Sequence, residues 1–448
     1  MLQLIRNYFK PSPYLPISRN SVRVNEAFKK MRWSVFLTAT FSYGLYYVCR
    51  LSLNVIKKPL ISNGYLTETQ LGIIGSALFF AYAIGKFTNG FLADRSNIKR
   101  FMAFGLFFSA IINIALGFTT SFMLFSILWA FNGWFQSMGA PPAIISITRW
   151  FSNKERGTYY GFFSASHNIG EATTFIVTAL FVTSFGWQWG FWGAGLIGLI
   201  GVMLIISFLH ESPQSKGLPS VAEFKGESSN NSIADKTIKT LQFEVLKNPF
   251  IWILAIASAF MYVSRYAINS WGILFLESQK EYSTLKASSI LSISSISGII
   301  GNIISGFISD KFFNGKRNIP ALIFGILNAI SLALFLFYPK GNLWMDMLSM
   351  ALFGLATGVL ICFLGGLMAV DIASKKAAGS ALGIVGIASY IGAALQDIIS
   401  GSLLEDSKVT INGVTHYNFT EVSYLWVGSA IISFLLALII WKVKPKED

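Results

Sequence analysis

Long apolar runs recur along almost the whole chain and are separated by short polar segments. Most of them reach the ~20 residues that an α-helix needs to cross a bilayer, so the pattern predicts a membrane protein made of helices. Twelve spans are predicted, at residues 34–56, 70–92, 102–118, 122–148, 158–184, 187–209, 249–277, 287–308, 320–338, 344–370, 378–403 and 422–442. The expected fold class is all-α.

The stretch YGLYYVCRLSL, residues 43–53, places a charged residue inside the first span. An ionisable side chain within the membrane costs at least ~2.5 kcal/mol and marks a functional site by default. Tyr43, Tyr47 and Arg50 follow each other at i, i+4 and i+7, so they share one helix face. The alternative for a lone arginine is that it snorkels to the membrane surface.

An internal repeat links the two ends of the chain. GFLADRSNIKR, residues 90–100, follows the second span, and GFISDKFFNGKR, residues 306–317, follows the eighth span 216 residues later. Six spans in each half indicate a duplicated bundle, which is the arrangement of the major facilitator fold. The expected organisation is a six-helix half over residues 1–209, a central loop over 210–248 and a second six-helix half over 249–448.

The repeat also supplies a second arginine. Arg50 lies 40 residues before Gly90, and Arg265 lies 41 residues before Gly306. Snorkelling has no reason to recur at the same offset, so we expect both arginines to face the junction between the halves. The seventh span repeats the helix face of the first with Tyr262, Arg265, Tyr266 and Asn269.

Two buried arginines facing one cavity favour an anionic ligand. Arginine stays protonated when buried, and its planar fork pairs best with a bidentate oxyanion, phosphate more fully than carboxylate. Lys86 and His167 add to the positive charge, although Lys86 pairing with Glu171 and a structural role for His167 are equally open. The predicted substrate site consists of Arg50, Arg265, His167, Lys86, Tyr43, Tyr47, Tyr82, Tyr262, Tyr266, Gln136, Asn168 and Asn269.

The distribution of charge predicts the orientation in the membrane. The net charge is +14, and most of the 35 Lys and Arg residues lie in the termini and in alternate loops. By the positive-inside rule these segments, both termini and the central loop are cytoplasmic, and no nucleic-acid partner is needed to explain the basic charge. Six lysines are assigned to the opposite loops: Lys57, Lys58, Lys280, Lys286, Lys340 and Lys408.

The repeated loop motifs are predicted to gate the transporter rather than to bind substrate. Asp94 and Arg95 in the first motif, with Asp310 and Lys311 in the second, are expected to hold helix ends together in one state and release them in another. The sequence shows no metal-binding cluster, catalytic triad, nucleotide-hydrolysis motif or phosphate-binding glycine loop. We therefore expect no cofactor, no metal and no enzymatic activity.

Several segments resemble the organophosphate:phosphate antiporter family within the major facilitators, nearly from end to end. The resemblance lies in GYLTETQLGIIGSALFFAYAIGKF (64–87), ADRSN (93–97), GWFQSMGAPP (133–142), ERGTYYGFFSASHNIG (155–170), ESPQSKGLPS (211–220) and KKAAGSALG (375–383). In that family the arginines of the first and seventh spans bind phosphate, assisted by a fifth-span histidine and a second-span lysine. The resemblance thus implies these roles for Arg50, Arg265, His167 and Lys86.

Within the family, SRYAINSWG (264–272) and SDKFFNGKRN (309–318) look most like the hexose-phosphate transporter and its sensor relative. The glycerol-phosphate members carry a lysine where this chain has Leu51. An aspartate and a lysine of the eleventh span that bear on substrate preference in the hexose-phosphate transporter are replaced here by Leu382 and Val385. Glu171 stands where the family has glycine, which places an acid that could compensate a positive charge or couple a proton.

The sequence as a whole predicts an inner-membrane antiporter, working as a monomer, that exchanges a sugar phosphate for inorganic phosphate. Hexose 6-phosphate, such as glucose 6-phosphate, is the expected substrate. Two alternatives stay open: a non-transporting sensor of hexose phosphate, and a transporter of glycerol 3-phosphate or another phosphorylated metabolite. A carboxylate transporter fits less well, because two arginines and a lysine exceed the charge of one carboxylate.

Overall fold

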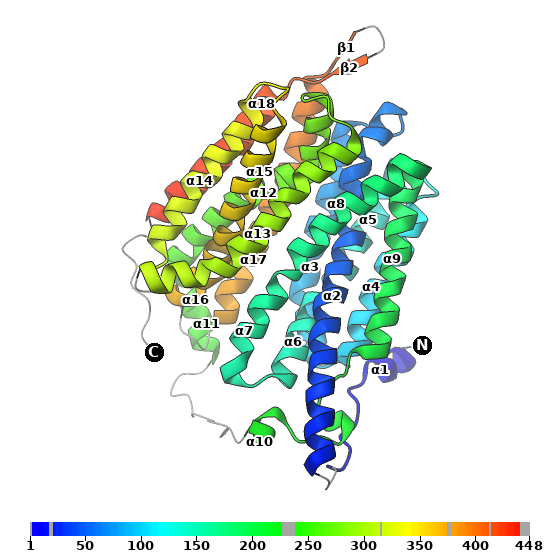
Figure 1. The fold of residues 1–448 in the computed structure, drawn as a ribbon, viewed down its shortest axis with the longest axis vertical. Coiled ribbons are helices and arrows are strands. Elements are labelled where there is room, and N and C mark those ends of the chain that lie inside the picture. Colours follow the sequence, from blue (N-terminus) through cyan, green and yellow to red (C-terminus); the bar gives the residue numbers. More distant parts are fainter. Residues whose placement is uncertain are drawn as a thin grey trace.

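Two helical bundles lie side by side in the computed structural model, one built from each half of the chain (Figure 1). The structure describes residues 2–17, 21–225, 238–313, 316–373, 378–411 and 414–439. The N-terminal bundle contains α1 (Leu2–Phe9), α2 (Ser21–Ser62), α3 (Glu68–Asp94), α4 (Ile98–Leu116), α5 (Phe122–Gln136), α6 (Ala140–Trp150), α7 (Asn153–Ser164), α8 (Ser166–Phe185) and α9 (Trp187–Phe208).

The C-terminal bundle follows a central segment that holds η1 (Gln214–Lys216), α10 (Val221–Lys225) and α11 (Ile238–Lys247). Its elements are α12 (Pro249–Ser278), α13 (Thr284–Phe312), α14 (Asn318–Phe337), α15 (Leu343–Cys362), the π-helix η2 (Phe363–Leu367), α16 (Met368–Ile372), α17 (Ala378–Asp406) and α18 (Thr420–Ile439). A hairpin of β1 (Val409–Ile411) and β2 (Val414–His416) joins α17 to α18.

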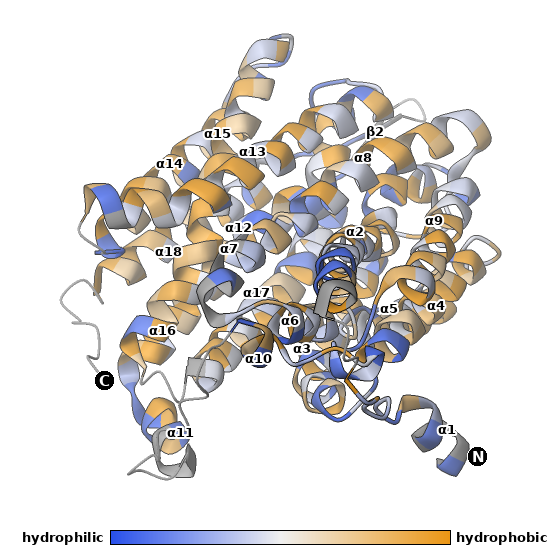
Figure 2. Cartoon of the chain, turned by 60° about the horizontal axis from the view of Figure 1, so that its bottom comes forward, coloured by the Kyte–Doolittle hydropathy of each residue, from blue (hydrophilic) through white to orange (hydrophobic). Residues whose placement is uncertain are grey.

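Two ends of the molecule are named here by their contents. The hairpin end carries β1 and β2, and the basic end carries α1, α10, α11 and the connection from α3 to α4 (Figure 1). Between them, hydrophobic colour covers the outer helices α4, α9, α14 and α18, while α1 and the projecting end of α2 are more hydrophilic (Figure 2). An apolar outer surface of this kind is what a lipid-facing protein presents.

Ten helices in the described residues are long and apolar enough to cross a membrane. The first and fourth predicted spans correspond to α2 and to the pair α5 and α6, which are not among these ten. In the fourth span the helix is interrupted at residues 137–139, just before a pair of prolines opens α6. The fifth predicted span is likewise divided between α7 and α8 at Ala165.

The helix of the first predicted span, α2, is longer than its apolar run, and this corrects one prediction. Lys57 was expected in a loop, but α2 continues to Ser62, and the Lys57 side chain is buried. Its Nζ lies 3.4 Å from Oδ1 of Asp397 on α17 and 3.5 Å from the ring centroid of Trp271 on α12. The ion pair and the aromatic ring compensate this buried charge.

The two halves are packed together at the hairpin end. Besides the Lys57–Asp397 pair, Glu68 of α3 accepts from Lys408 Nζ at 2.7 Å and from the Tyr417 hydroxyl at 2.6 Å. Gly72 and Gly75 of α3 face Asp397 so closely that a Cβ at either position would overlap it. A side chain at these glycines would therefore separate α3 from α17.

The same two helices separate toward the basic end. A Cβ at Gly90 of α3, or at Gly379 or Gly383 of α17, would meet no atom within 4 Å. Lys86 of α3 is exposed, one turn beyond the buried Tyr82. The structure is thus closed at the hairpin end and open at the basic end.

Candidate functional site

Arg50 is buried at the junction of the halves and is surrounded by aromatic rings. Its guanidinium carbon lies 3.9 Å from the ring centroid of Tyr82, 5.2 Å from that of Tyr47 and 5.7 Å from that of Tyr390. Among the residues that the structure describes, no carboxylate pairs with Arg50, and its Nε and Nη2 atoms have no hydrogen-bond partner. Ring faces stabilise the cation, but its directed donors stay available to a ligand.

Arg265 occupies the corresponding place in the C-terminal half and does have a carboxylate partner. Its Nη2 donates to Oε2 of Glu171 at 3.2 Å, so α12 of one half is joined to α8 of the other. The Ser295 hydroxyl of α13 donates to the second oxygen, Oε1, at 2.9 Å. Sequence left Glu171 open as a partner of Lys86; the structure pairs it with Arg265.

A cluster of tyrosines lies around the two arginines and includes one residue that the sequence reasoning missed. The Tyr390 ring on α17 lies 4.6 Å from Tyr82, 5.7 Å from Tyr262 and 6.3 Å from Tyr266, centroid to centroid. Tyr266 and Tyr262 in turn lie 5.3 and 5.9 Å from the Arg265 guanidinium carbon. The sequence gives no signal for Tyr390, because no charged residue lies three or four positions from it on its own helix.

Several polar atoms near the arginines have no partner within the described protein. They are Arg50 Nε and Nη2, His167 Nε2, Asn168 Nδ2, Asn269 Nδ2 and the Tyr266 hydroxyl. Buried polar groups are normally paired, so a concentration of unpaired donors marks a place where a polar ligand fits. Asn168, Asn269, Glu171 and Arg265 also line one small pocket. We call this region, from Arg50 to this pocket, the two-arginine site.

The remaining predicted members lie around this site. Tyr43 and Tyr47 of α2 are 5.7 Å apart, and Tyr47 lies 6.0 Å from the His167 ring. The Lys86 ammonium lies 5.5 Å from the Tyr390 ring, on the open side of the cluster. The second-span lysine therefore sits where a ligand would enter from the basic end.

Gln136 differs from its prediction. Its Nε2 donates to the Tyr46 carbonyl at 2.9 Å and to Ser109 Oγ at 2.7 Å, inside the N-terminal bundle. Next to it, Asn113 and Asn132 each donate to the Cys49 carbonyl at 2.9 Å. These amides hold α2 against α4 and α5 directly behind Arg50, so Gln136 positions the helix and is not available to substrate hydroxyls in this structure.

The predicted gating residues lie at the basic end. Asp94 and Arg95 are exposed at the end of α3, and Lys311 is exposed near the end of α13. Asp310 belongs to α13, but its side chain is outside the described part of the chain, as are residues 375–377 of the KKAAGSALG motif. Gating by these residues stays a prediction.

A family model described as Major Facilitator Superfamily matches residues 35–396. A "Probable hexose phosphate transport protein" of Chlamydia muridarum is 34% identical over 90% of this chain and 92% of that protein. The chain belongs to the organophosphate:phosphate antiporter family of the major facilitator superfamily. It is therefore a multi-pass membrane protein of the transporter class and not an enzyme.

Other members of the family have different names and roles. A "Membrane sensor protein UhpC" of Salmonella typhimurium is 32% identical over 89% of this chain and 91% of that protein. A "Glycerol-3-phosphate transporter" of Bacillus subtilis is 31% identical over 99% of both chains. Membership of this family supports organophosphate transport. The hexose-phosphate, sensor and glycerol-3-phosphate relatives match the chain at nearly the same identity.

Solved structures support the fold alone. A bacterial homologue of the lysosomal transporter Spinster, in an inward-facing and unoccupied conformation, has a TM-score of 0.71 at 17% identity, covering 94% of this chain and all of that one. The nucleoside transporter NupG has a TM-score of 0.69 at 19% identity, covering 92% of this chain and all of that one. The expected all-α major facilitator fold is confirmed.

Proposed function

We propose that this protein exchanges a sugar phosphate, with hexose 6-phosphate as the expected substrate, for inorganic phosphate across the inner membrane. The observation that carries the proposal is the pair of buried arginines at the junction, one on α2 and one on α12, with unpaired donors around them. A phosphoryl group offers enough oxygens to pair with two guanidinium forks, whereas a carboxylate has only two oxygens and pairs with them less fully. Relatives named as hexose phosphate and glycerol-3-phosphate transporters support the same ligand class.

In the proposed mechanism, the phosphoryl group binds between Arg50 and Arg265. The substrate replaces Glu171 as the counter-ion of Arg265 and at the same time neutralises Arg50. Asn168, Asn269 and the Tyr266 hydroxyl contribute polar contacts, and the tyrosine rings cover the apolar faces of the sugar. His167 and Lys86 add donors on the side of the N-terminal half.

Alternating access follows from the asymmetry of the two ends. We assign the basic end to the cytoplasm by the positive-inside rule, with both termini on that side. The described conformation is then open to the cytoplasm and closed at the hairpin end by Lys57–Asp397 and Glu68–Lys408. Among the described residues Glu171 pairs with Arg265 alone, so an empty site leaves the charge of Arg50 without a carboxylate, which disfavours the return of the empty carrier and favours exchange. We propose that one chain carries out this cycle as a monomer.

The exchange is tested with purified full-length protein in liposomes that are preloaded with phosphate. Uptake of labelled glucose 6-phosphate is compared with uptake into unloaded liposomes and by the Arg265→Ala variant. Uptake that needs both internal phosphate and Arg265 supports the proposal. Equal uptake into loaded and unloaded liposomes contradicts exchange.

The second candidate is a hexose-phosphate sensor, favoured by the 32% identity to the protein named as a membrane sensor. It predicts tight, Arg265-dependent binding of glucose 6-phosphate without uptake. Uptake of glycerol 3-phosphate but not of glucose 6-phosphate would instead assign the protein to another branch of the family. The same liposomes distinguish these outcomes.

A further inference from the structure

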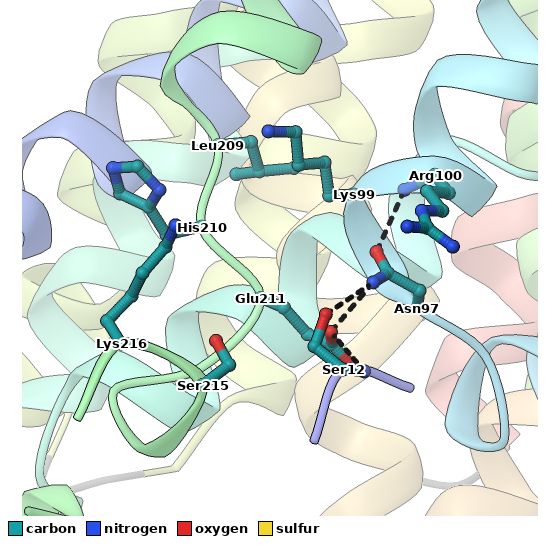
Figure 3. Close-up of a pocket in the computed structure, with 9 residues that line it drawn as sticks. All are labelled: Ser12, Asn97, Lys99, Arg100, Leu209, His210, Glu211, Ser215 and Lys216. Atoms are coloured by element: carbon teal, nitrogen blue, oxygen red, sulfur yellow. Dashed lines mark hydrogen bonds between the residues drawn. The ribbon is translucent and has the colours of Figure 1, made fainter. Parts of the chain in front are cut away.

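A second polar pocket lies at the basic end and shares no residue with the two-arginine site. Figure 3 shows its lining residues. Three segments form it: the N-terminal segment at Ser12, the beginning of α4, and the chain that follows α9. Its volume is about 170 Å³. Since one water needs at least ~10–15 Å³ by this measure, a compact polar group fits inside. We call it the Lys99 pocket.

One wall of the Lys99 pocket is a set of satisfied hydrogen bonds. Glu211 Oε2 accepts from the Ser12 backbone nitrogen at 2.9 Å and from Asn97 Nδ2 at 2.8 Å, and Glu211 Oε1 lies 3.5 Å from Arg149 Nη1. The carboxylate at this site is therefore already used to hold the three segments together and to pair with Arg149. It does not neutralise the other wall.

The opposite wall is basic. Figure 3 shows Lys99, His210 and Lys216 across the pocket from the Ser12, Asn97 and Glu211 cluster. In the described residues neither Lys99 nor Lys216 forms an ion pair, and Nδ1 of His210 is buried without a hydrogen-bond partner. Burial, with Lys216 and Lys99 nearby, lowers the pKa of His210 to about 4.

The backbone adds to this positive potential. Asn97 caps α4, and its Oδ1 accepts from the Arg100 nitrogen at 3.1 Å. The first turn of a helix carries a partial positive charge, and here two cationic residues, Lys99 and Arg100, stand on that turn. Cations are unfavourable beside this partial charge, and a bound anion would offset both.

We infer that the Lys99 pocket binds a phosphate-containing anion, either free inorganic phosphate or the headgroup of an anionic lipid, with Lys99, Lys216 and His210 as its donors. Lysine ammonium groups pair with phosphate as point charges, and three donors from two segments, α4 and the chain after α9, suit a group with several oxygens. The pocket shares no residue with the two-arginine site, and occupancy would fasten the chain after α9 to the start of α4.

The surroundings are compatible with the lipid source. Tyr14, Leu15 and Ile17 are exposed beside this pocket, and the Leu15 nitrogen donates to the Gln214 carbonyl at 3.0 Å. Exposed aromatic and aliphatic side chains next to basic groups are typical of segments that lie at a membrane surface. Free phosphate would use the same donors, so the experiment has to separate the two sources.

The first arm of the test measures Tm of the full-length protein in detergent against inorganic phosphate at constant ionic strength. All proteins carry Arg265→Ala, so that any phosphate binding left at the two-arginine site is weakened and is the same in every protein compared. Lys99→Gln/Lys216→Gln is compared with Lys286→Gln/Lys340→Gln, which removes two lysines at the hairpin end instead. If free phosphate is the ligand, the pocket variant needs about tenfold more phosphate for the same shift.

The second arm uses nanodiscs of phosphatidylcholine with or without phosphatidylglycerol, followed by native mass spectrometry of retained lipid. If a headgroup is the ligand, phosphatidylglycerol stays bound to the parent and to the control but is lost from the pocket variant. Should the double variant fail to fold, the single change Lys216→Gln at an exposed position replaces it. The inference is overturned if neither the phosphate shift nor lipid retention depends on these lysines.

Discussion

Arg265 and Glu171 belong to different halves of the molecule, yet Nη2 of one lies 3.2 Å from Oε2 of the other. Both side chains are almost fully buried, so this pair is an internal counter-ion contact at the centre of the two-arginine site. Arg50 has no such contact among the described residues. Under the proposed function, a phosphate that binds between the arginines has to compete with Glu171, and we expect this competition to lower the affinity of the site.

Replacing Glu171 by glutamine is expected to tighten the binding of inorganic phosphate. The amide cannot neutralise Arg265, so the anion no longer has to displace a carboxylate. An affinity increase of about tenfold corresponds to ~1.4 kcal/mol. The dissociation constant is measured on detergent-solubilised protein by calorimetry.

Ser295→Ala is the matched control for this change, because it removes the hydrogen bond to Glu171 Oε1 but leaves the charge. We expect a much smaller change in affinity for this variant. Weaker phosphate binding by Glu171→Gln would show that Glu171 helps to bind the ligand, for example by sharing a proton with it, rather than competing with it.

Arg50→Lys is expected to abolish or severely impair exchange. Lysine keeps the charge but loses the bidentate fork, and losing one charge-assisted hydrogen bond lowers affinity by about 10- to 100-fold. Exchange is measured in phosphate-loaded liposomes, with Arg149→Lys as a control outside the site. Near-normal exchange by Arg50→Lys would contradict the proposal that Arg50 and Arg265 bind the phosphoryl group together.

The sequence alone predicted that Arg50 and Arg265 occupy equivalent positions in the two halves. Hydropathy located the spans, and the repeated motifs gave an offset that placed Arg50 and Arg265 in equivalent positions. The structure brings both into one aromatic cluster. Internal symmetry made this possible, because it converts a distance along the chain into a position in space.

Contacts between elements could not be predicted in the same way. The pairing of Glu171 with Arg265 depends on how α8 and α12 are rotated about their axes, which periodicity does not specify. Lys57 was assigned to a loop because hydropathy ends the span at a charge, whereas the helix continues and Asp397 compensates the charge. The predicted substrate contact of Gln136 differs from the structure for a similar reason, because its hydrogen-bond partners lie on α2 and α4.

Asp397→Asn is expected to open the hairpin end. The change leaves the Lys57 ammonium buried without its carboxylate, and removing one partner of a buried pair costs ~3–5 kcal/mol. Spin labels at the exposed positions Tyr65 and Val409, one in each half, report the separation by electron–electron double resonance. A longer distance in the variant is the expected result.

The double change Lys57→Met/Asp397→Leu is the control for charge. Both groups are removed together, so no unpaired charge is left, and such replacements are often neutral or stabilising. The distance between the labels should then return toward that of the parent. If the single and double variants open equally, packing against Gly75 rather than the ion pair holds this end closed.

His210 gives a prediction for pH. Burial and the nearby Lys216 and Lys99 lower the pKa of His210 to about 4, below the ordinary value of ~6.5. Between these two values the unfolded chain binds more protons at His210 than the folded chain does, so the free energy of unfolding falls as the pH is lowered from about 6.5 to about 4. In phosphate-free buffer, His210→Gln should flatten this part of the Tm profile, whereas His416→Gln, which removes an exposed histidine at the hairpin end, should leave it unchanged. An unchanged profile in His210→Gln would mean that the pKa of His210 is not lowered in the folded protein. The loss of stability at low pH would then come from other groups.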